Sequence, residues 1–265
     1  MIFVAAGTQD GRELAGFLLG SGYEVTASVV SQYGGELLEE YQNRGLVVNK
    51  EPLDENALEQ YIQQHAIDLF VDASHPYAVN VSANAMAACH EQGIPYIRYE
   101  RKASVVTYKK AYLVQNYEEA AQKAAELGKA VFLTTGSRNL EVFANSPYLQ
   151  ECTLTARVLP EPEVIAGCIG LGFQPAQIIA MQGPFSRELN MELYKKYKAE
   201  VIVTKNSGQI GGTDTKFAAA MELDLPVVLI DRPKVQYDHL AQSFAGVLAF
   251  AKKVYGNADL FELPL

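Results

Sequence analysis

A glycine-rich loop that begins with a lysine is the segment of this chain best suited to hold an anion. It follows the β-branched run 201–204 and leads toward a predicted helix. Backbone N–H groups next to glycines and the positive end of a helix both attract negative charge. The lysine precedes the glycines, whereas a P-loop places it after them, so ATP hydrolysis is disfavoured. The residues expected to contact the anion are Lys205, Ser207, Gly208, Gly211, Gly212 and Lys216.

Two other turns in the second half of the chain also follow apolar, strand-like runs. The carboxyl ends of parallel strands meet at one edge of a sheet, so these turns are expected to converge with the lysine loop. A helix cap explains Ser186 by itself, but it does not explain the stiff turn before it. The predicted ligand contacts in these turns are Thr135, Gly136, Ser137, Arg138, Gln182, Gly183, Phe185 and Ser186.

The chain opens with another strand, glycine turn and helix, where a doubly wound sheet binds the pyrophosphate of a dinucleotide. The G-x-G-x-x-G fingerprint is absent, and a turn without ligand explains the glycines almost as well. The second predicted strand ends without the Asp or Glu of an NAD-specific site, which favours NADPH over NADH. The expected coenzyme contacts are Gly7, Thr8, Asp10, Gly11, Arg12, Ser28, Tyr33 and Ser74.

Polar residues also follow the fourth and fifth predicted strands. His75 and Tyr77 flank Pro76, which stiffens the turn, and either side chain could donate a proton. The alternative is a structural turn that faces solvent. Arg98 and Arg101 could form forked contacts with carboxylates, or else pair with surface acids.

Short apolar runs alternate with helical patterns along the whole chain, which predicts parallel sheets with crossover helices. The first half has predicted strands at 2–6, 24–30, 46–49, 69–73 and 96–99, and the second half has six more. Because open sheets rarely exceed about ten strands, two Rossmann-like domains without the glycine fingerprint are favoured over one sheet. We place them at 1–100 and 101–265, with a long last helix near 237–254 that packs across either domain.

Composition narrows the class of protein. The 265 residues carry a net charge of -9, which disfavours a nucleic-acid binder, because phosphate contacts need a basic surface. Three widely spaced cysteines predict free thiols and no metal site. A leader sequence and a membrane-length apolar run are both missing, which favours a cytoplasmic protein without membrane partners.

Six segments together resemble the precorrin-6A reductase family of cobalamin biosynthesis: GTQDGRELA, DASHPYAVNVSANA, GIPYIRYER, LTTGSRNL, MQGPFSRELN and VTKNSGQIGG. They occur in order from Gly7 to Gly212. The resemblance implies that NADPH or NADH reduces one ring double bond of precorrin-6A or its cobalt complex. It also implies a tetrapyrrole substrate with many carboxylates and hand-over to neighbouring pathway enzymes.

The resemblance makes the first domain the favoured coenzyme site and the second the favoured tetrapyrrole site, although the reverse assignment stays open. His75, Tyr77, solvent or the substrate would supply the proton. Two other functions remain. One is a different nicotinamide-dependent reductase or epimerase, for which Tyr194 and Lys198 have the Tyr-x-x-x-Lys spacing. The other is a non-catalytic dinucleotide sensor, which would need an effector module that the chain has no spare segment to form.

Overall fold

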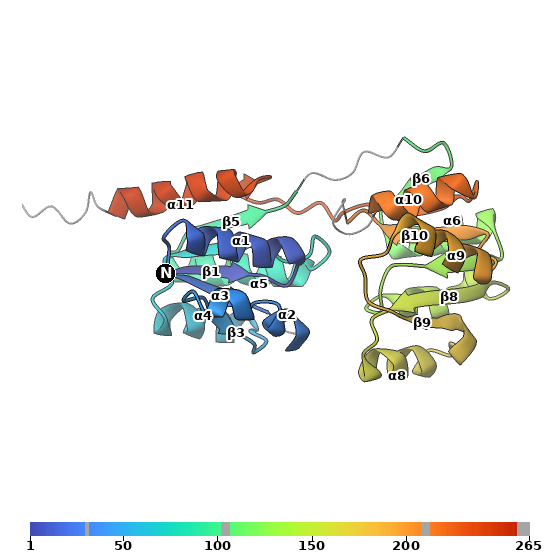
Figure 1. The fold of residues 1–265 in the computed structure, drawn as a ribbon, viewed down its shortest axis with the longest axis horizontal. Coiled ribbons are helices and arrows are strands. Elements are labelled where there is room, and N and C mark those ends of the chain that lie inside the picture. Colours follow the sequence, from blue (N-terminus) through green and yellow to red (C-terminus); the bar gives the residue numbers. More distant parts are fainter. Residues whose placement is uncertain (30–31, 102–106, 208–212, 259–265) are drawn as a thin grey trace, which may run out of the picture. The chain divides into compact units, whose positions relative to one another are not determined.

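The computed structural model describes residues 1–29, 32–101, 107–207 and 213–258, which form two compact units (Figure 1). Unit 1 comprises Met1–Lys102 together with Lys234–Leu265, and unit 2 comprises Ala103–Pro233. Each unit has its own six-stranded sheet, and all recorded strand pairs are parallel. This confirms the predicted fold class.

The sheet of unit 1 has the strand order β3-β2-β1-β4-β5-β12. Its strands are β1 (Ile2–Ala5), β2 (Val25–Ser28), β3 (Val47–Asn49), β4 (Leu69–Asp72), β5 (Tyr96–Tyr99) and β12 (Leu240–Ala241). Its helices are α1 (Gln9–Gly20), α2 (Gln32–Glu36), α3 (Glu39–Gln42), α4 (Glu55–Gln64), α5 (Val79–Gln92) and α11 (Phe244–Ala258). Strand order reverses between β1 and β4, and ligands of such sheets bind at the carboxyl ends of the strands there.

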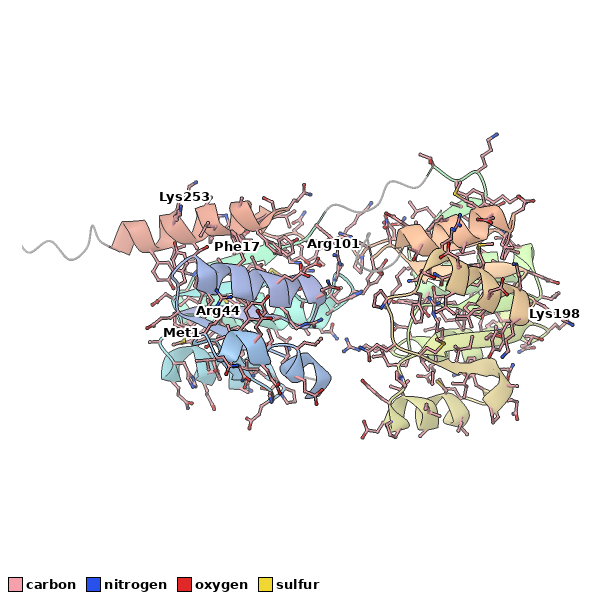
Figure 2. The ribbon with its side chains drawn as sticks, viewed as in Figure 1. Met1, Phe17, Arg44, Arg101, Lys198 and Lys253 are labelled. Atoms are coloured by element: carbon pink, nitrogen blue, oxygen red, sulfur yellow. The ribbon has the colours of Figure 1, made fainter. Side chains whose placement is uncertain are left out.

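Alternation along β1 divides the core of unit 1 between the two faces of the sheet. Ile2 and Val4 pack against α1 and α11. Phe3 points to the opposite face and packs against α4 and α5. Burial on both faces explains why β1 is almost continuously apolar. In Figure 2, Arg101 lies at the carboxyl end of this sheet and Met1 at the other end.

Unit 2 repeats the same strand order, β9-β8-β7-β10-β11-β6. Its strands are β6 (Ala111–Val114), β7 (Ala130–Leu133), β8 (Thr153–Val158), β9 (Ile178–Ala180), β10 (Val201–Lys205) and β11 (Val227–Ile230). Its helices are α6 (Tyr117–Leu127), α7 (Leu140–Ala144), η1 (Pro147–Leu149), α8 (Pro162–Gly170), η2 (Pro175–Gln177), α9 (Arg187–Lys196) and α10 (Thr213–Glu222). Its order reverses between β7 and β10, directly before the predicted anion loop.

The sixth strand of each sheet follows a crossover from the other unit. The chain leaves unit 1 after β5 and forms β6, which lies at one end of the second sheet. After β11 it returns to unit 1, where β12 pairs with β5. Within the described residues, 234–258 belong to unit 1 and pack against α1 and β4 through α11, so the prediction that 101–265 forms one domain is wrong for this segment.

The last helix differs from its predicted bounds of 237–254. The last helix begins at Phe244, and the residues before it include β12, a two-residue strand that no apolar run marks. Between β2 and β3 the chain forms two short helices, α2 and α3. Within the described ranges, no helix is long and apolar enough to cross a membrane.

Candidate active site

The β1–α1 turn in unit 1 is built by close contact between the ends of β1 and β4. Thr8 caps α1, because its Oγ1 accepts a hydrogen bond from the Gly11 N–H at 3.0 Å. The same hydroxyl donates to the Ala73 carbonyl at 3.0 Å. A Cβ atom on Gly11 would lie 2.9 Å from Ala6 Cα and 3.0 Å from the Ala73 oxygen. Only glycine allows this approach of helix and strands.

Replacing Gly11 by alanine is therefore expected to lower the free energy of unfolding of unit 1 by about 1–3 kcal/mol, because α1 must move away from two backbone segments. Gly7→Ala is the matched control, since a Cβ atom there would meet nothing within 4 Å. Urea unfolding of both variants measures the difference. Equal effects of the two substitutions would contradict the packing argument.

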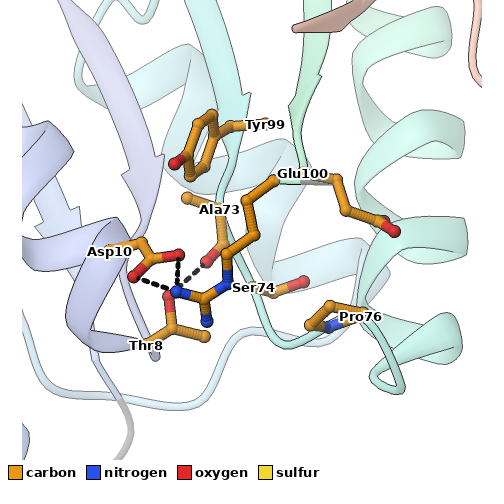
Figure 3. A pocket seen from close by; sticks show the side chains of 8 residues that line it. Thr8, Asp10, Ala73, Ser74, Pro76, Tyr99 and Glu100 are labelled. Carbon is orange, nitrogen blue, oxygen red and sulfur yellow. Dashed lines mark hydrogen bonds and ion pairs between the residues drawn. The ribbon is translucent and has the colours of Figure 1, made fainter. Parts of the chain in front are cut away.

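Asp10 and Arg101 form an ion pair beside the N-terminus of α1. Arg101 Nη1 lies 2.6 Å from the Asp10 carboxylate, which is 4% exposed. Burial raises the pKa of Asp10, and Arg101 opposes that rise. The pair borders a pocket at the carboxyl edge of the sheet (Figure 3). The pocket is lined by Thr8, Asp10, Ala73, Ser74, Pro76, Tyr99, Glu100 and Arg101.

A buried ion pair holds the loop after β4. Arg98 and Asp72 are 1% and 0% exposed, and Arg98 Nη1 lies 2.8 Å from Asp72 Oδ1. Arg98 also donates to the Ser74 hydroxyl at 3.0 Å and to the Ser74 carbonyl at 3.1 Å. Ser82 and Tyr96 donate to the other carboxylate oxygen at 2.6 and 2.7 Å. Burial favours the neutral acid, but Arg98 and these hydrogen bonds hold the pKa of Asp72 below its usual value.

This network corrects the expectation that Arg98 contacts substrate. The Arg98 guanidinium is enclosed and held by Asp72 and Ser74, so its position makes it a support for the loop. Arg101 retains 20% exposure and reaches the pocket, but it also pairs with Asp10. Sequence reasoning missed Asp72, Ser82 and Tyr96; the one available signal was an acid that closes an otherwise apolar strand.

The other predicted residues of unit 1 are placed around the same edge. His75 and Tyr77 lie side by side, with ring centroids 5.5 Å apart, and His75 Nδ1 accepts from the Tyr77 N–H at 3.3 Å. Ser28 ends β2, and its hydroxyl accepts from the Asn49 side chain at 3.1 Å. Arg12 lies in α1 and Tyr33 in α2.

In unit 2, four cations from separate segments surround the carboxyl ends of β7 and β10. They are Arg138 after β7, Arg157 on β8, Lys205 on β10 and Lys216 on α10. Burial lowers the pKa of Lys216 to about 7, with contributions from Arg157 and Lys205. Burial and Arg138 lower the pKa of Lys205 to about 8. Because burial and like charges both oppose protonation, an entering carboxylate would stabilise the charged lysines.

Arg157 is buried and held by two side chains of unit 2. It is 5% exposed, its Nη1 donates to Asn190 Oδ1 at 2.7 Å, and its guanidinium lies 3.9 Å from the centroid of the Phe185 ring. Burial lowers its pKa. A Cβ atom on Gly183 would lie 3.0 Å from that ring, so the turn and the arginine are packed together. The face of the Phe185 ring thus contacts the Arg157 guanidinium. Ser186 is the N-cap of α9, as the sequence also allowed.

Two buried hydroxyl groups lie on residues at or just after the ends of β7 and β10. The buried Thr135 Oγ1 and Thr204 Oγ1 have no hydrogen-bond partner within the described ranges; Thr135 follows β7 and Thr204 lies in β10, the two strands at the reversal of strand order. Gly136 adopts φ +79, where a larger residue would be strained. Ser137 and Arg138 line a groove with α7 and α8. Ser207 is buried after Lys205, whereas Gly208, Gly211 and Gly212 lie outside the described residues.

The alternative Tyr-x-x-x-Lys site is not supported by this geometry. Tyr194 is 1% exposed, and its ring packs edge-on against Phe132 in the core of unit 2. Burial raises its pKa, which is the opposite of what a tyrosine acting as a base needs. Lys198 follows the helix end with φ 50.

Comparison with known proteins places these features in a family. Residues 1–252 match the family model described as "Precorrin-6x reductase CbiJ/CobK". A cobalt-precorrin-6A reductase of Priestia megaterium is 41% identical over 249 residues, which covers 94% of this chain and 96% of the relative. One of Methanocaldococcus jannaschii is 38% identical over 239 residues, covering 89% of this chain and 92% of the relative.

A solved structure has the same architecture. The structure titled "CobK precorrin-6A reductase" has a TM-score of 0.74 and 25% sequence identity, and the match covers 96% of each chain. The family model, the relatives and the structure all extend over both units. The chain therefore belongs to the precorrin-6x reductase family.

Proposed function

We propose that this protein uses NADPH to reduce one ring double bond of precorrin-6A, or of its cobalt complex, in cobalamin biosynthesis. The observation that carries the proposal is the near full-length match to cobalt-precorrin-6A reductases, which spans both units. We also propose that the protein acts in the cytoplasm and hands its product to neighbouring enzymes of the pathway.

Unit 1 offers a fit for the coenzyme at the reversal of strand order. A Cβ atom on Gly7 would meet no other atom within 4 Å, so the backbone there is open to a ligand. The N-terminus of α1 follows Gly7, and Ser74 and Arg101 line the adjacent pocket. These groups suit a pyrophosphate, because helix N-termini and guanidiniums both stabilise anions. Asp10 works against that charge and is offset by Arg101. A bound nicotinamide would supply the hydride; the protein positions the reactants and excludes water.

Unit 2 offers a fit for the tetrapyrrole carboxylates. Arg157 is held by Asn190 and Phe185, so a carboxylate would meet a preorganised guanidinium. Lys205 and Lys216 would regain full charge when carboxylates enter. In the proposed reaction a proton reaches the ring carbon next to the reduced one. His75, Tyr77 or solvent can supply it, and the charged Lys205 Nζ is a further donor.

The proposal is tested by following coenzyme absorbance with NADPH or NADH, and with precorrin-6A or cobalt-precorrin-6A. Oxidation of coenzyme that depends on one of the tetrapyrroles is the expected result. Lack of oxidation with every combination would exclude the proposed reaction.

Single replacements assign the ligands to the two units. Lys205→Ala is expected to weaken tetrapyrrole binding by about tenfold or more, and Arg12→Ala to weaken coenzyme binding. If Lys205→Ala weakens coenzyme binding and spares the tetrapyrrole, the assignment of ligands is reversed while the reaction itself stands.

A further inference from the structure

One buried arginine of unit 2 has no acidic partner among the residues that the structure describes. Arg157 lies on β8 and is 5% exposed, no carboxylate of the described ranges forms an ion pair with it, and burial lowers its pKa. At Arg98 in unit 1 burial acts in the same direction, but Asp72 and nearby groups outweigh it and the pKa is raised. The two arginines are alike in burial and differ in the charge of the residue that holds them.

Asn190 of α9 holds Arg157 in place of an acid. The Arg157 Nη1 group donates to Asn190 Oδ1 at 2.7 Å, and Asn190 is fully buried. The Asn190 Nδ2 group donates to the Ser186 carbonyl, one helical turn earlier, at 2.9 Å. Because Nδ2 is engaged by the backbone of α9, the accepting end of the amide faces the guanidinium.

The outer edge of the Arg157 guanidinium remains open to a ligand. Asn190 holds Nη1, and one face of the group lies against the Phe185 ring. Nε and Nη2 donate to none of the described residues, and neither atom is fully enclosed. These two groups point to the same side of the guanidinium, where they match the two oxygens of a carboxylate.

The identity of residue 190 determines whether Arg157 keeps its charge for that ligand. An aspartate at this position would hold Nη1 through a charge-assisted bond, but it would also neutralise the guanidinium. The asparagine amide has nearly the same shape and holds the same atom without a negative charge. After burial, Arg157 and Lys205 both contribute to the lowered pKa of Lys216, so the positive charge gathered here is uncompensated. An entering carboxylate therefore meets a guanidinium that is fixed in position and still charged.

We propose that Asn190 is a positioning residue, which presents the Nε and Nη2 edge of Arg157 to one carboxylate of the tetrapyrrole and, being neutral, leaves the positive charge for that carboxylate. This inference rests on the proposed function in taking the tetrapyrrole as the ligand of unit 2. An acid at position 190 would act as an internal competitor of the substrate.

The test compares Asn190→Asp with Asn190→Ser by calorimetric titration of the full chain with cobalt-precorrin-6A. Both variants give up the Nδ2 bond to Ser186, but only the first adds a charge. Asn190→Asp is expected to weaken tetrapyrrole binding by about tenfold to a hundredfold, and Asn190→Ser by about threefold to tenfold. A role limited to packing gives the reverse order, because aspartate is closer to asparagine in shape and still reaches Arg157.

Steady-state kinetics and a matched control separate binding from chemistry. Both variants are expected to raise KM for the tetrapyrrole and to leave kcat within about threefold, because the carboxylate is bound equally before and during the reaction. NADPH binding is expected to stay within about twofold. Asn145→Asp is the control, since it adds the same charge at an exposed position of unit 2, and it is expected to change tetrapyrrole binding by less than about twofold.

A double-mutant cycle with Arg157→Met shows whether Asn190 acts through Arg157. Without the guanidinium, either substitution of Asn190 is expected to change tetrapyrrole affinity by less than about twofold. Circular dichroism establishes that each variant is folded, and the cycle with Asn190→Ser is sufficient if Asn190→Asp does not fold.

The inference is overturned if Asn190→Ser weakens binding as much as Asn190→Asp, if either substitution has the same effect with and without Arg157, or if the wild type does not bind the tetrapyrrole. Failure of the proposed reaction is a separate result. It appears as lack of coenzyme oxidation by a wild-type protein that still binds cobalt-precorrin-6A.

Discussion

Replacing Arg98 by methionine is expected to lower the free energy of unfolding of unit 1 by about 3–5 kcal/mol. The substitution leaves the Asp72 carboxylate buried without its cation, and breaking one side of a buried pair has about this effect. Ser74 loses two hydrogen bonds at the same time, so the loop at the pocket loses its support. Coenzyme affinity is therefore expected to fall together with stability.

Urea unfolding and coenzyme titration measure these two effects. Arg44→Met is the matched control, because Arg44 is an exposed arginine in the same unit. The double variant Arg98→Met with Asp72→Leu is expected to recover part of the stability, since it buries no lone charge. It is not expected to recover coenzyme affinity, because Ser74 stays unsupported. A double variant as unstable as Arg98→Met would argue against an unpaired carboxylate as the cause.

Replacing Lys216 by methionine is expected to remove a strong pH dependence from the stability of unit 2. The pKa of Lys216 is about 7 in the folded protein, against 10.5 for an ordinary lysine. Between these values the unfolded chain binds a proton that the folded chain does not. Wild-type stability therefore rises with pH from about 7 to 10.5, by about 3–5 kcal/mol. The variant lacks this rise and is more stable than the wild type near pH 7.

The same lysine couples ligand binding to protonation. Carboxylates near Lys216 and Lys205 favour their charged forms, so the complex takes up protons when it forms near pH 8. Tetrapyrrole affinity is expected to fall as the pH rises from about 7 to 9. Calorimetry in buffers of different ionisation enthalpy measures the proton uptake, with Lys196→Met as the exposed control. Uptake that is unchanged in Lys216→Met would show that other groups bind the protons.

The fold could be predicted from the sequence because apolar, β-branched runs mark strands that are buried on both faces of a sheet. β1 and β10 are examples, and both were expected where they occur. β12 escaped prediction because only two residues pair, and one of them, Leu240, is 52% exposed. The return of the chain to unit 1 depends on packing of α11 against α1, which no local pattern encodes.

The candidate site could be predicted from the sequence only in part. Parallel strands force their carboxyl-end turns to one edge, so Ser74, Lys205 and Lys216 could be named from order alone. The role of Arg98 could not, because its partner Asp72 is 26 residues away and the pair forms only when β4 and β5 lie side by side.

The return of the chain to unit 1, where it forms β12 and α11, has a consequence for synthesis on the ribosome. Unit 2 is continuous in the chain and can fold before residues 240–258 emerge. Unit 1 has to wait: until residues 240–258 emerge, β5 keeps an unpaired edge and the face that α11 covers stays open. An exposed sheet edge is a template for wrong pairing. The nascent chain is therefore most vulnerable to aggregation in its earliest-made half, which is completed only when residues 240–258 have emerged.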